Sequence, residues 1–243
     1  LDLVVAIEDE RDHRAVADRR RLAIERADYA ERGLPLAIEA PATRVIEHRR
    51  GADAVRRVVR GAGELGIPVL TLFAFSTENW TRPADEVNDL MGLLRGFIKS
   101  DIDEFAANDV RLKIIGNYKV LAPDIVDMID DALARTAHNT RTTLAVALNY
   151  GSQGELVRAA QAASSEGAIT AEAIERHLDT ADMPPLDLLI RTSGEQRLSN
   201  FMLWQAAYAE LWFTETLWPD FTAAEFDAAL SEFGTRERRY GGR

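Results

Sequence analysis

Apolar residues recur at helical spacing in some segments of this chain and form short continuous runs in others. The helical spacing predicts helices over 51–66, from Pro83 through Ile98, and over 123–137, 155–163 and 171–178. The continuous runs are rich in strand-forming residues and predict strands over 69–75, 110–115, 143–148 and 186–190. Such runs are typical of strands buried on both faces. The alternation predicts an α/β fold: a single domain with a mostly parallel central sheet flanked by helices.

The first 47 residues differ from the rest of the chain in their pattern of apolar and charged residues. The apolar run 3–7 predicts a short strand. Residues 8–32 are densely charged helix formers with only a thin apolar stripe. No internal repeat or low-complexity tract occurs in the chain. The segment therefore adds one short strand to the expected sheet.

Composition and charge narrow the class of protein. The 243 residues include no cysteine, which excludes disulfides and thiolate metal sites and fits a cytoplasmic protein. The 29 basic and 40 acidic side chains give a net charge of −11, which argues against a non-specific nucleic-acid binder. No run approaches the roughly 18 apolar residues of a spanning helix, and no leader-like segment opens the chain. We therefore expect a globular cytoplasmic protein that binds no nucleic acid.

A first polar cluster, residues 76–82, follows a predicted strand. Open parallel sheets bind their ligands at the carboxyl ends of the strands. The carboxamide, guanidinium and hydroxyl groups of this cluster could orient an anion and a proton there. The alternative is a plain helix entry, with Ser76 or Thr77 as the cap and Glu78 in the first turn.

A second polar cluster, residues 191–200, follows the strand predicted over 186–190. Arg191 and Arg197 stand six residues apart with a glycine between them, so both guanidinium groups could converge on one phosphate. Ser199 adds a hydroxyl, and a helix expected to begin at Phe201 would add backbone N–H donors. The alternative is a surface loop with solvated arginines.

A third, weaker cluster is Asn149-Tyr150-Gly151, which follows the strand predicted over 143–148. Asn and Gly in this order are common in turns, so the segment alone carries little functional information. Its place after a strand adds a third polar segment to the expected ligand edge.

Glu210 lies among small and aromatic residues, where a carboxylate has to be paired, protonated or bound to a cation. One solution is a hard oxygen ligand for Mg²⁺ beside a diphosphate. The other is a salt bridge to an arginine.

These motifs closely resemble those of the cis-prenyltransferases, most of all the bacterial undecaprenyl diphosphate synthases, or isoprenyl transferases. The resemblance is carried by FAFSTENWTRP at 73–83, VRLKIIG at 110–116, DLLIRTSGEQRLSNF at 187–201, LWQ at 203–205, YAE at 208–210, WPDF at 218–221 and RERRYGG at 236–242. It implies one cis-prenyltransferase domain over 1–243, in which 48–242 match the family and 1–47 are atypical.

The resemblance implies Mg²⁺-dependent condensation of isopentenyl diphosphate with an allylic diphosphate such as farnesyl diphosphate. The product would be a polyprenyl diphosphate, undecaprenyl diphosphate in the closest relatives, which serves as a cell-wall lipid carrier. The growing chain would occupy an apolar tunnel between the sheet and two helices. A homodimer is also implied, as is a cytoplasmic enzyme that works peripherally at the membrane to which its product is directed.

The resemblance also assigns roles to individual residues. Arg191, Arg197 and Ser199 would hold isopentenyl diphosphate, and Glu210 would help to hold Mg²⁺. Asn79 would abstract the proton or orient its abstraction, which makes it the catalytic residue. The remaining substrate-binding positions would be Arg44, His48, Ser76, Thr77, Glu78, Trp80, Arg82 and Leu198.

One departure from the family is large. The family carries an Asp-Gly-Asn-Gly-Arg-Trp loop after its first strand, and this string is absent here. One register places 31–36 there, with Glu31 as the carboxylate; another makes 5–7 the first strand and Asp9 the carboxylate. Without the glycines the backbone approaches a phosphate less closely. An alternative function is therefore a catalytically impaired subunit that binds prenyl diphosphates.

Overall fold

The structure, a computed structural model, describes residues 2–6 and 41–236, with side chains from residue 50 onward. Six strands form one sheet in the order β3-β4-β2-β1-β5-β6, and every neighbouring pair is parallel. The strands are β1 (Asp2–Ala6), β2 (Val69–Ser76), β3 (Val110–Ile115), β4 (Thr142–Tyr150), β5 (Leu188–Arg191) and β6 (Glu210–Phe213). The carboxyl ends of all six strands therefore lie at one edge, where open α/β sheets bind ligands.

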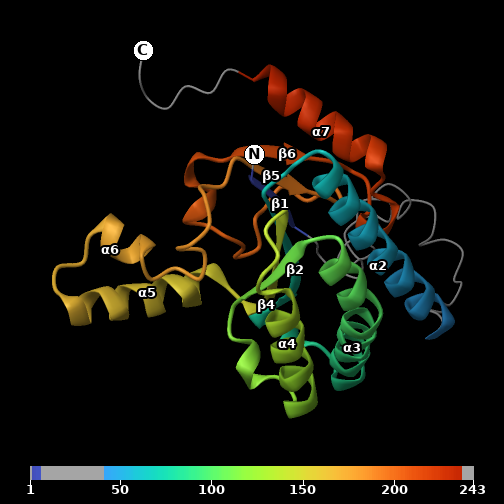
Figure 1. The fold of residues 1–243 in the computed structure, drawn as a ribbon, viewed down its shortest axis with the longest axis horizontal. Helices are drawn as coiled ribbons and strands as arrows, with labels where there is room; N and C mark the ends of the chain where they lie inside the picture. Colours follow the sequence, from blue (N-terminus) through green and yellow to red (C-terminus); the bar gives the residue numbers. More distant parts are fainter. Residues whose placement is uncertain (1, 7–40, 237–243) are drawn as a thin grey trace, which may run out of the picture.

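Helices connect the strands and cover the sheet (Figure 1). The α-helices are α2 (Pro41–Glu64), α3 (Ala84–Ala107), α4 (Pro123–Thr136), α5 (Ser152–Glu166), α6 (Ala171–Glu175) and α7 (Ala223–Thr235). Short 3-10 helices are η1 (Thr77–Thr81), η2 (Tyr118–Val120), η3 (Gln205–Tyr208) and η4 (Trp218–Asp220). The predicted class, one α/β domain with a parallel sheet flanked by helices, is confirmed. No helix in the described part of the chain is long and apolar enough to cross a bilayer.

The two faces of the sheet bury separate apolar clusters, because successive strand residues point to opposite faces. In β5, Leu188 and Ile190 belong to one cluster and Leu189 to the other. The first cluster is covered by residues of α2, α3, α4 and α7. The second packs the loop between β5 and η3 (residues 192–204, the late loop) against the sheet, where the rings of Phe73 and Phe201 stack at 4.3 Å. Sheet packing thus fixes the segment that follows the second polar cluster.

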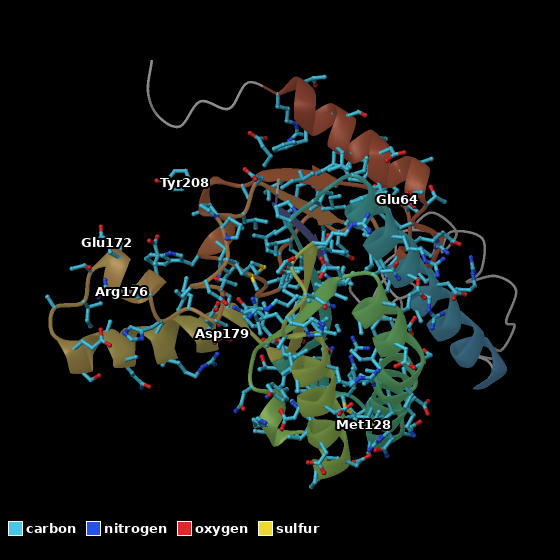
Figure 2. All side chains as sticks on the ribbon, viewed as in Figure 1. Glu64, Met128, Glu172, Arg176, Asp179 and Tyr208 are labelled. Atoms are coloured by element: carbon cyan, nitrogen blue, oxygen red, sulfur yellow. The ribbon has the colours of Figure 1, made fainter. Side chains whose placement is uncertain are left out.

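Helices α5 and α6 form an arm that extends from the body of the molecule, with Glu172 and Arg176 at its surface (Figures 1 and 2). The arm is anchored at its base through Glu155, whose carboxylate is buried. This carboxylate accepts hydrogen bonds from the Tyr150 hydroxyl at 2.6 Å and from the backbone N–H of Asp179 at 2.9 Å. Burial, together with the Glu155 charge, raises the pKa of Tyr150, so its hydroxyl stays protonated and donates.

The structure differs from the sequence-based expectations at several places. The helix expected to begin at Phe201 is absent, because Ser199, Asn200 and Met202 have positive φ angles, which an α-helix excludes. Helix α2 begins ten residues before the predicted 51–66 segment. The strand expected over 3–7 is present as β1, whereas the charged stretch 8–32 lies outside the described residues. Strand β6 was not predicted.

Candidate active site

Hydrogen bonds join the three polar clusters at the carboxyl edge of the sheet. The Asn200 amide donates from Nδ2 to Glu78 Oε1 at 2.9 Å, which links the late loop to η1. The Trp80 indole N–H donates to Asn149 Oδ1 at 2.7 Å, which links η1 to the end of β4. The third cluster, weak by itself in the sequence, is therefore part of the same assembly.

The first cluster forms the end of β2 and the 3-10 helix η1, so a helix entry and a polar site coincide there. The backbone N–H of Ser76 donates to Asn79 Oδ1 at 2.7 Å and fixes the plane of the Asn79 carboxamide. Burial raises the pKa of Glu78, but hydrogen bonds from Asn200, its own backbone N–H, and the Ser76 and Thr77 hydroxyls outweigh burial and lower it. Glu78 is therefore an ionised acceptor.

Trp80 and Arg82 complete the η1 side of the assembly. The Trp80 ring is 44% exposed and meets Phe75 edge to face at 5.1 Å between ring centroids. Arg82 forms an ion pair with Glu86 of α3 at 2.7 Å, and both side chains are largely buried. The pair holds the Arg82 guanidinium near the start of α3, so its place is set before any ligand arrives.

The second cluster places one arginine on a strand and the other on a loop. Arg191, the last residue of β5, is fully buried, and its Nη2 lies 3.5 Å from Ser199 Oγ. Arg197 forms an ion pair with the buried Glu195 carboxylate, while its own side chain is half-exposed. Leu198 packs against the second apolar cluster. The structure thus brings Ser199 to Arg191 and pairs Arg197 with a carboxylate that sequence reasoning did not single out.

The backbone of this loop is held by the chain that follows β6. The N–H groups of Ser193 and Gly194 donate to the carbonyls of Thr216 and Thr214, each at 2.8 Å. Gly194 has a φ of +70°, and a Cβ there would lie 2.4 Å from the Glu215 carboxylate. The glycine between the two arginines is therefore required both by its conformation and by the close approach of Glu215.

Glu210 lies at the other end of the sheet from these loops. It opposes Leu188 at the start of β5, whereas Arg191 at the end of β5 opposes Phe213. Three strand residues separate the two levels, roughly 10 Å along the strand. Glu210 Oε2 accepts a hydrogen bond from Arg236 at 2.9 Å, which is the salt bridge that the sequence left open. The described residues hold no group of three or more acidic or histidine side chains placed for a metal.

Several predicted residues fall outside the described side chains. Arg44 and His48 lie in the first turns of α2, whose side chains are described only from Arg50 onward. Glu31 and Asp9 lie outside the described residues altogether. The first described strand is β1, between β2 and β5, which agrees with the register that makes 5–7 the first strand.

An apolar crevice lies between α3, α4 and the strands β3 and β4, and contains about 380 Å³ of empty space including the part open to solvent. Its lining includes Phe97, Ile98, Ile129, Val146 and Leu148. No polar atom contributes to its lining surface. Leu148 immediately precedes Asn149, which accepts the hydrogen bond from Trp80, so this part of the lining is next in sequence to the third polar cluster.

Comparisons with known proteins agree with this arrangement. Residues 37–241 match the family model described as putative undecaprenyl diphosphate synthase. An isoprenyl transferase of Zymomonas mobilis is 54% identical over 208 residues, covering 82% of this chain and 84% of the relative. An isoprenyl transferase of Agrobacterium fabrum is 50% identical, covering 87% and 85%.

Solved structures give the same result. A probable undecaprenyl diphosphate synthase from Campylobacter jejuni is 29% identical, with a TM-score of 0.76 over 100% of this chain and 99% of that one. Lavandulyl diphosphate synthase from Lavandula x intermedia, in complex with dimethylallyl diphosphate, is 30% identical, with a TM-score of 0.80 over 99% and 98%. With its sequence matches, parallel sheet and strand-end clusters in agreement, the chain belongs to the undecaprenyl diphosphate synthase family of prenyltransferases.

Proposed function

We propose that this enzyme condenses isopentenyl diphosphate with an allylic diphosphate, farnesyl diphosphate being the expected primer, to give a polyprenyl diphosphate. In each cycle a bond forms between the alkene of isopentenyl diphosphate and the allylic carbon, the carbon–oxygen bond of the allylic substrate breaks with its electron pair leaving on the released diphosphate, and the isopentenyl unit gives up a proton to water or to that diphosphate. The observation that carries the proposal is the presence in one domain of an arginine-containing polar edge and a wholly apolar crevice. A substrate with a charged head and a hydrocarbon tail fits both.

Arg191, Arg197 and Ser199 are proposed to hold the isopentenyl diphosphate. Arg191 offers a buried guanidinium beside the Ser199 hydroxyl, and charge-assisted hydrogen bonds to phosphate are among the stronger ones. Arg197 would exchange Glu195 for a phosphate oxygen when the substrate binds. Leu198 packs inward and would support the loop from beneath.

Asn79 is proposed to orient the reacting isopentenyl unit. A carboxamide is a poor base, and Asn79 Oδ1 already accepts the N–H of Ser76. Its Nδ2 can still donate a hydrogen bond to a substrate oxygen. This bond would orient the isopentenyl unit for loss of its proton, and Asn79 itself would not accept the proton. Thr77, Trp80 and Arg82, with Arg44 and His48 of α2, are proposed to line the allylic side.

Magnesium dependence is part of the same proposal. When bound, Mg²⁺ would neutralise the leaving diphosphate, and it is commonly held by one or two carboxylates together with substrate phosphates. Glu210 is the proposed carboxylate by its resemblance to the family's metal-holding glutamate, and its partner in this structure is Arg236. It lies at the far end of β6 from Arg191, so the described residues of one chain do not gather a complete site, and no step here depends on the ion.

The crevice is proposed to take the growing prenyl chain, and undecaprenyl diphosphate is the proposed product. The hydrophobic effect supports this role of the crevice, because each methylene moved from water into an apolar site stabilises the bound chain by about 0.8 kcal/mol. We also propose a homodimer, which fits the place of β6 at the edge of the sheet that the described residues form and the exposed Tyr208 ring near it (Figure 2). We propose finally that the enzyme acts at the membrane surface, to which its product would be directed.

The proposal is tested with radiolabelled isopentenyl diphosphate and farnesyl diphosphate, in the presence of Mg²⁺ or EDTA, followed by extraction and chain-length analysis. We expect labelled polyprenyl products with Mg²⁺ and their loss with EDTA. Binding of isopentenyl diphosphate without condensation would instead identify the impaired binding subunit. A chain that neither binds nor condenses the substrate would refute both functions.

A further inference from the structure

Asn200 connects three segments at the carboxyl edge that are far apart in the sequence. Its Nδ2 donates to Glu78 Oε1 at 2.9 Å, across 122 residues of chain. Its Oδ1 accepts the backbone N–H of Gln153 at 2.9 Å, and its carbonyl accepts the N–H of Ser152 at 2.8 Å. Both ends of the side-chain amide are thus directed at the segments that flank the late loop.

The surroundings of Asn200 are adapted to this contact. Its φ is +61°, a left-handed conformation that asparagine tolerates better than most residues. Gly151 faces it, and a Cβ on Gly151 would lie only 2.7 Å from Asn200 Nδ2 and 2.6 Å from Thr77 Oγ1. The bridge therefore requires an asparagine on one side and a residue without a side chain on the other.

We propose that Asn200 is a positioning residue, which sets the phosphate-binding loop at a fixed place relative to the η1 segment that carries Asn79. Ser199 precedes Asn200 directly, and Glu78 precedes Asn79 directly, so the Asn200–Glu78 bond joins the two proposed substrate-binding elements. The bridge orders Ser199 and the adjacent arginine loop before the diphosphate arrives, and this lowers the cost of binding. The inference rests on the proposed function, since it names a determinant of the isopentenyl diphosphate site.

The test uses an exchange of donor and acceptor. Asn200→Asp keeps the acceptor for Gln153 and tolerates the left-handed φ, but it sets a carboxylate against Glu78. Glu78→Gln in the same chain supplies an amide that donates to this new carboxylate, so the bond is restored in the opposite direction. Asn200→Gly removes the side chain at no conformational cost, because glycine adopts positive φ freely.

A stability-matched control is Asn139→Ala. Asn139 is buried near the amino ends of β3 and β4, where its Nδ2 donates to the carbonyls of Phe105 and Val110. This variant loses side-chain hydrogen bonds that are more buried than those of Asn200, and it loses them at the opposite end of the sheet from the site. It separates a local effect on binding from a general loss of stability.

Isopentenyl diphosphate affinity is measured by calorimetric titration of each folded variant. We expect Asn200→Asp and Asn200→Gly to weaken binding about tenfold, the loss typical of one charge-assisted hydrogen bond. The double variant should bind isopentenyl diphosphate more tightly than Asn200→Asp, losing less than the separate losses of Asn200→Asp and Glu78→Gln added together, and Asn139→Ala should bind like the parent. Unchanged affinity of Asn200→Asp, or failure of the double variant to recover, would overturn the positioning role.

A ligand-free measurement separates this inference from the proposed function. Urea unfolding of the parent, Asn200→Asp, Glu78→Gln and the double variant gives the coupling between Glu78 and Asn200 directly. Absence of coupling would overturn the bridge whatever the substrate is. Lack of isopentenyl diphosphate binding by the parent would instead overturn the proposed function. That result needs only the parent protein and no variant.

Discussion

Gly151→Ala should be far more harmful than Gly154→Ala, although the two glycines stand three residues apart. Gly151 has an extended backbone that any residue adopts, so its requirement is steric. A Cβ there would lie 2.6 Å from Thr77 Oγ1 and 2.7 Å from Asn200 Nδ2. Favourable carbon contacts need about 3.5 Å, so both neighbours must retreat by roughly 1 Å.

The cost follows from what that retreat breaks. Overpacking costs about 1–3 kcal/mol, and a hydrogen bond to a charged group such as Asn200–Glu78 is worth about 1.5–3 kcal/mol. We expect Gly151→Ala to lower the free energy of unfolding by about 2–4 kcal/mol. At Gly154 in α5 the nearest atom to a new Cβ is Arg158 Nη1 at 3.8 Å, an ordinary contact. Alanine in the helix should therefore stabilise the protein by about 0.5 kcal/mol.

Urea unfolding measures both variants against the parent. With a slope of about 2–3 kcal/mol per molar, the midpoints of the two variants should differ by about 1–2 M. Equal midpoints would mean that Thr77 and Asn200 yield to the new methyl group, and the packing argument would fail. The packing argument would also be contradicted if Gly151→Ala unfolded at the same urea concentration as the parent while its substrate binding was weakened.

Three further predictions concern single charges. Arg197→Ala should raise the KM for isopentenyl diphosphate about tenfold, and an unchanged KM in steady-state kinetics would remove Arg197 from the site. If Glu210 holds Mg²⁺, Glu210→Gln should weaken the Mg²⁺ dependence of turnover; identical titrations would leave it only the Arg236 pair. Burial raises the pKa of Asp101, but hydrogen bonds from Arg56 and Ser100 outweigh it and lower the pKa. The contribution of the Asp101 carboxylate to the free energy of unfolding should therefore decrease as the pH falls below about 4. In Asp101→Asn, the free energy of unfolding should depend less steeply on pH in this acid range.

Much of the fold could be predicted because its pattern is local. The runs 69–75 and 110–115 are continuous and apolar, and they became β2 and β3 almost unchanged. Strand β6 has only four residues, partly exposed at the edge of the sheet, so no run marks it. The helix expected at Phe201 failed because stacking on Phe73 and the left-handed turn before it decide that segment.

The place of the polar clusters was predictable from the strand-end rule, whereas the contacts that side chains make across the fold were not. Arg191 and Asn79 follow strands and could be named from the sequence. The Asn200–Glu78 bond joins residues that no local pattern relates, and the Glu195 pair of Arg197 depends on a loop whose shape the chain after β6 sets. The sequence does place an asparagine next to Ser199, and asparagine tolerates the left-handed conformation that the structure shows there.

Arg191 at the end of β5 and Arg197 in the loop that follows differ in how they are held in the structure. Arg191 is a strand residue with no exposed surface, so its guanidinium keeps one place with or without a ligand. Arg197 is half-exposed and already paired with Glu195, so a diphosphate that binds there exchanges one anionic partner for another. Its contribution to affinity is the difference between the two pairs. On the proposed function, Arg191 would therefore fix where the diphosphate lies, whereas Arg197 would close on it.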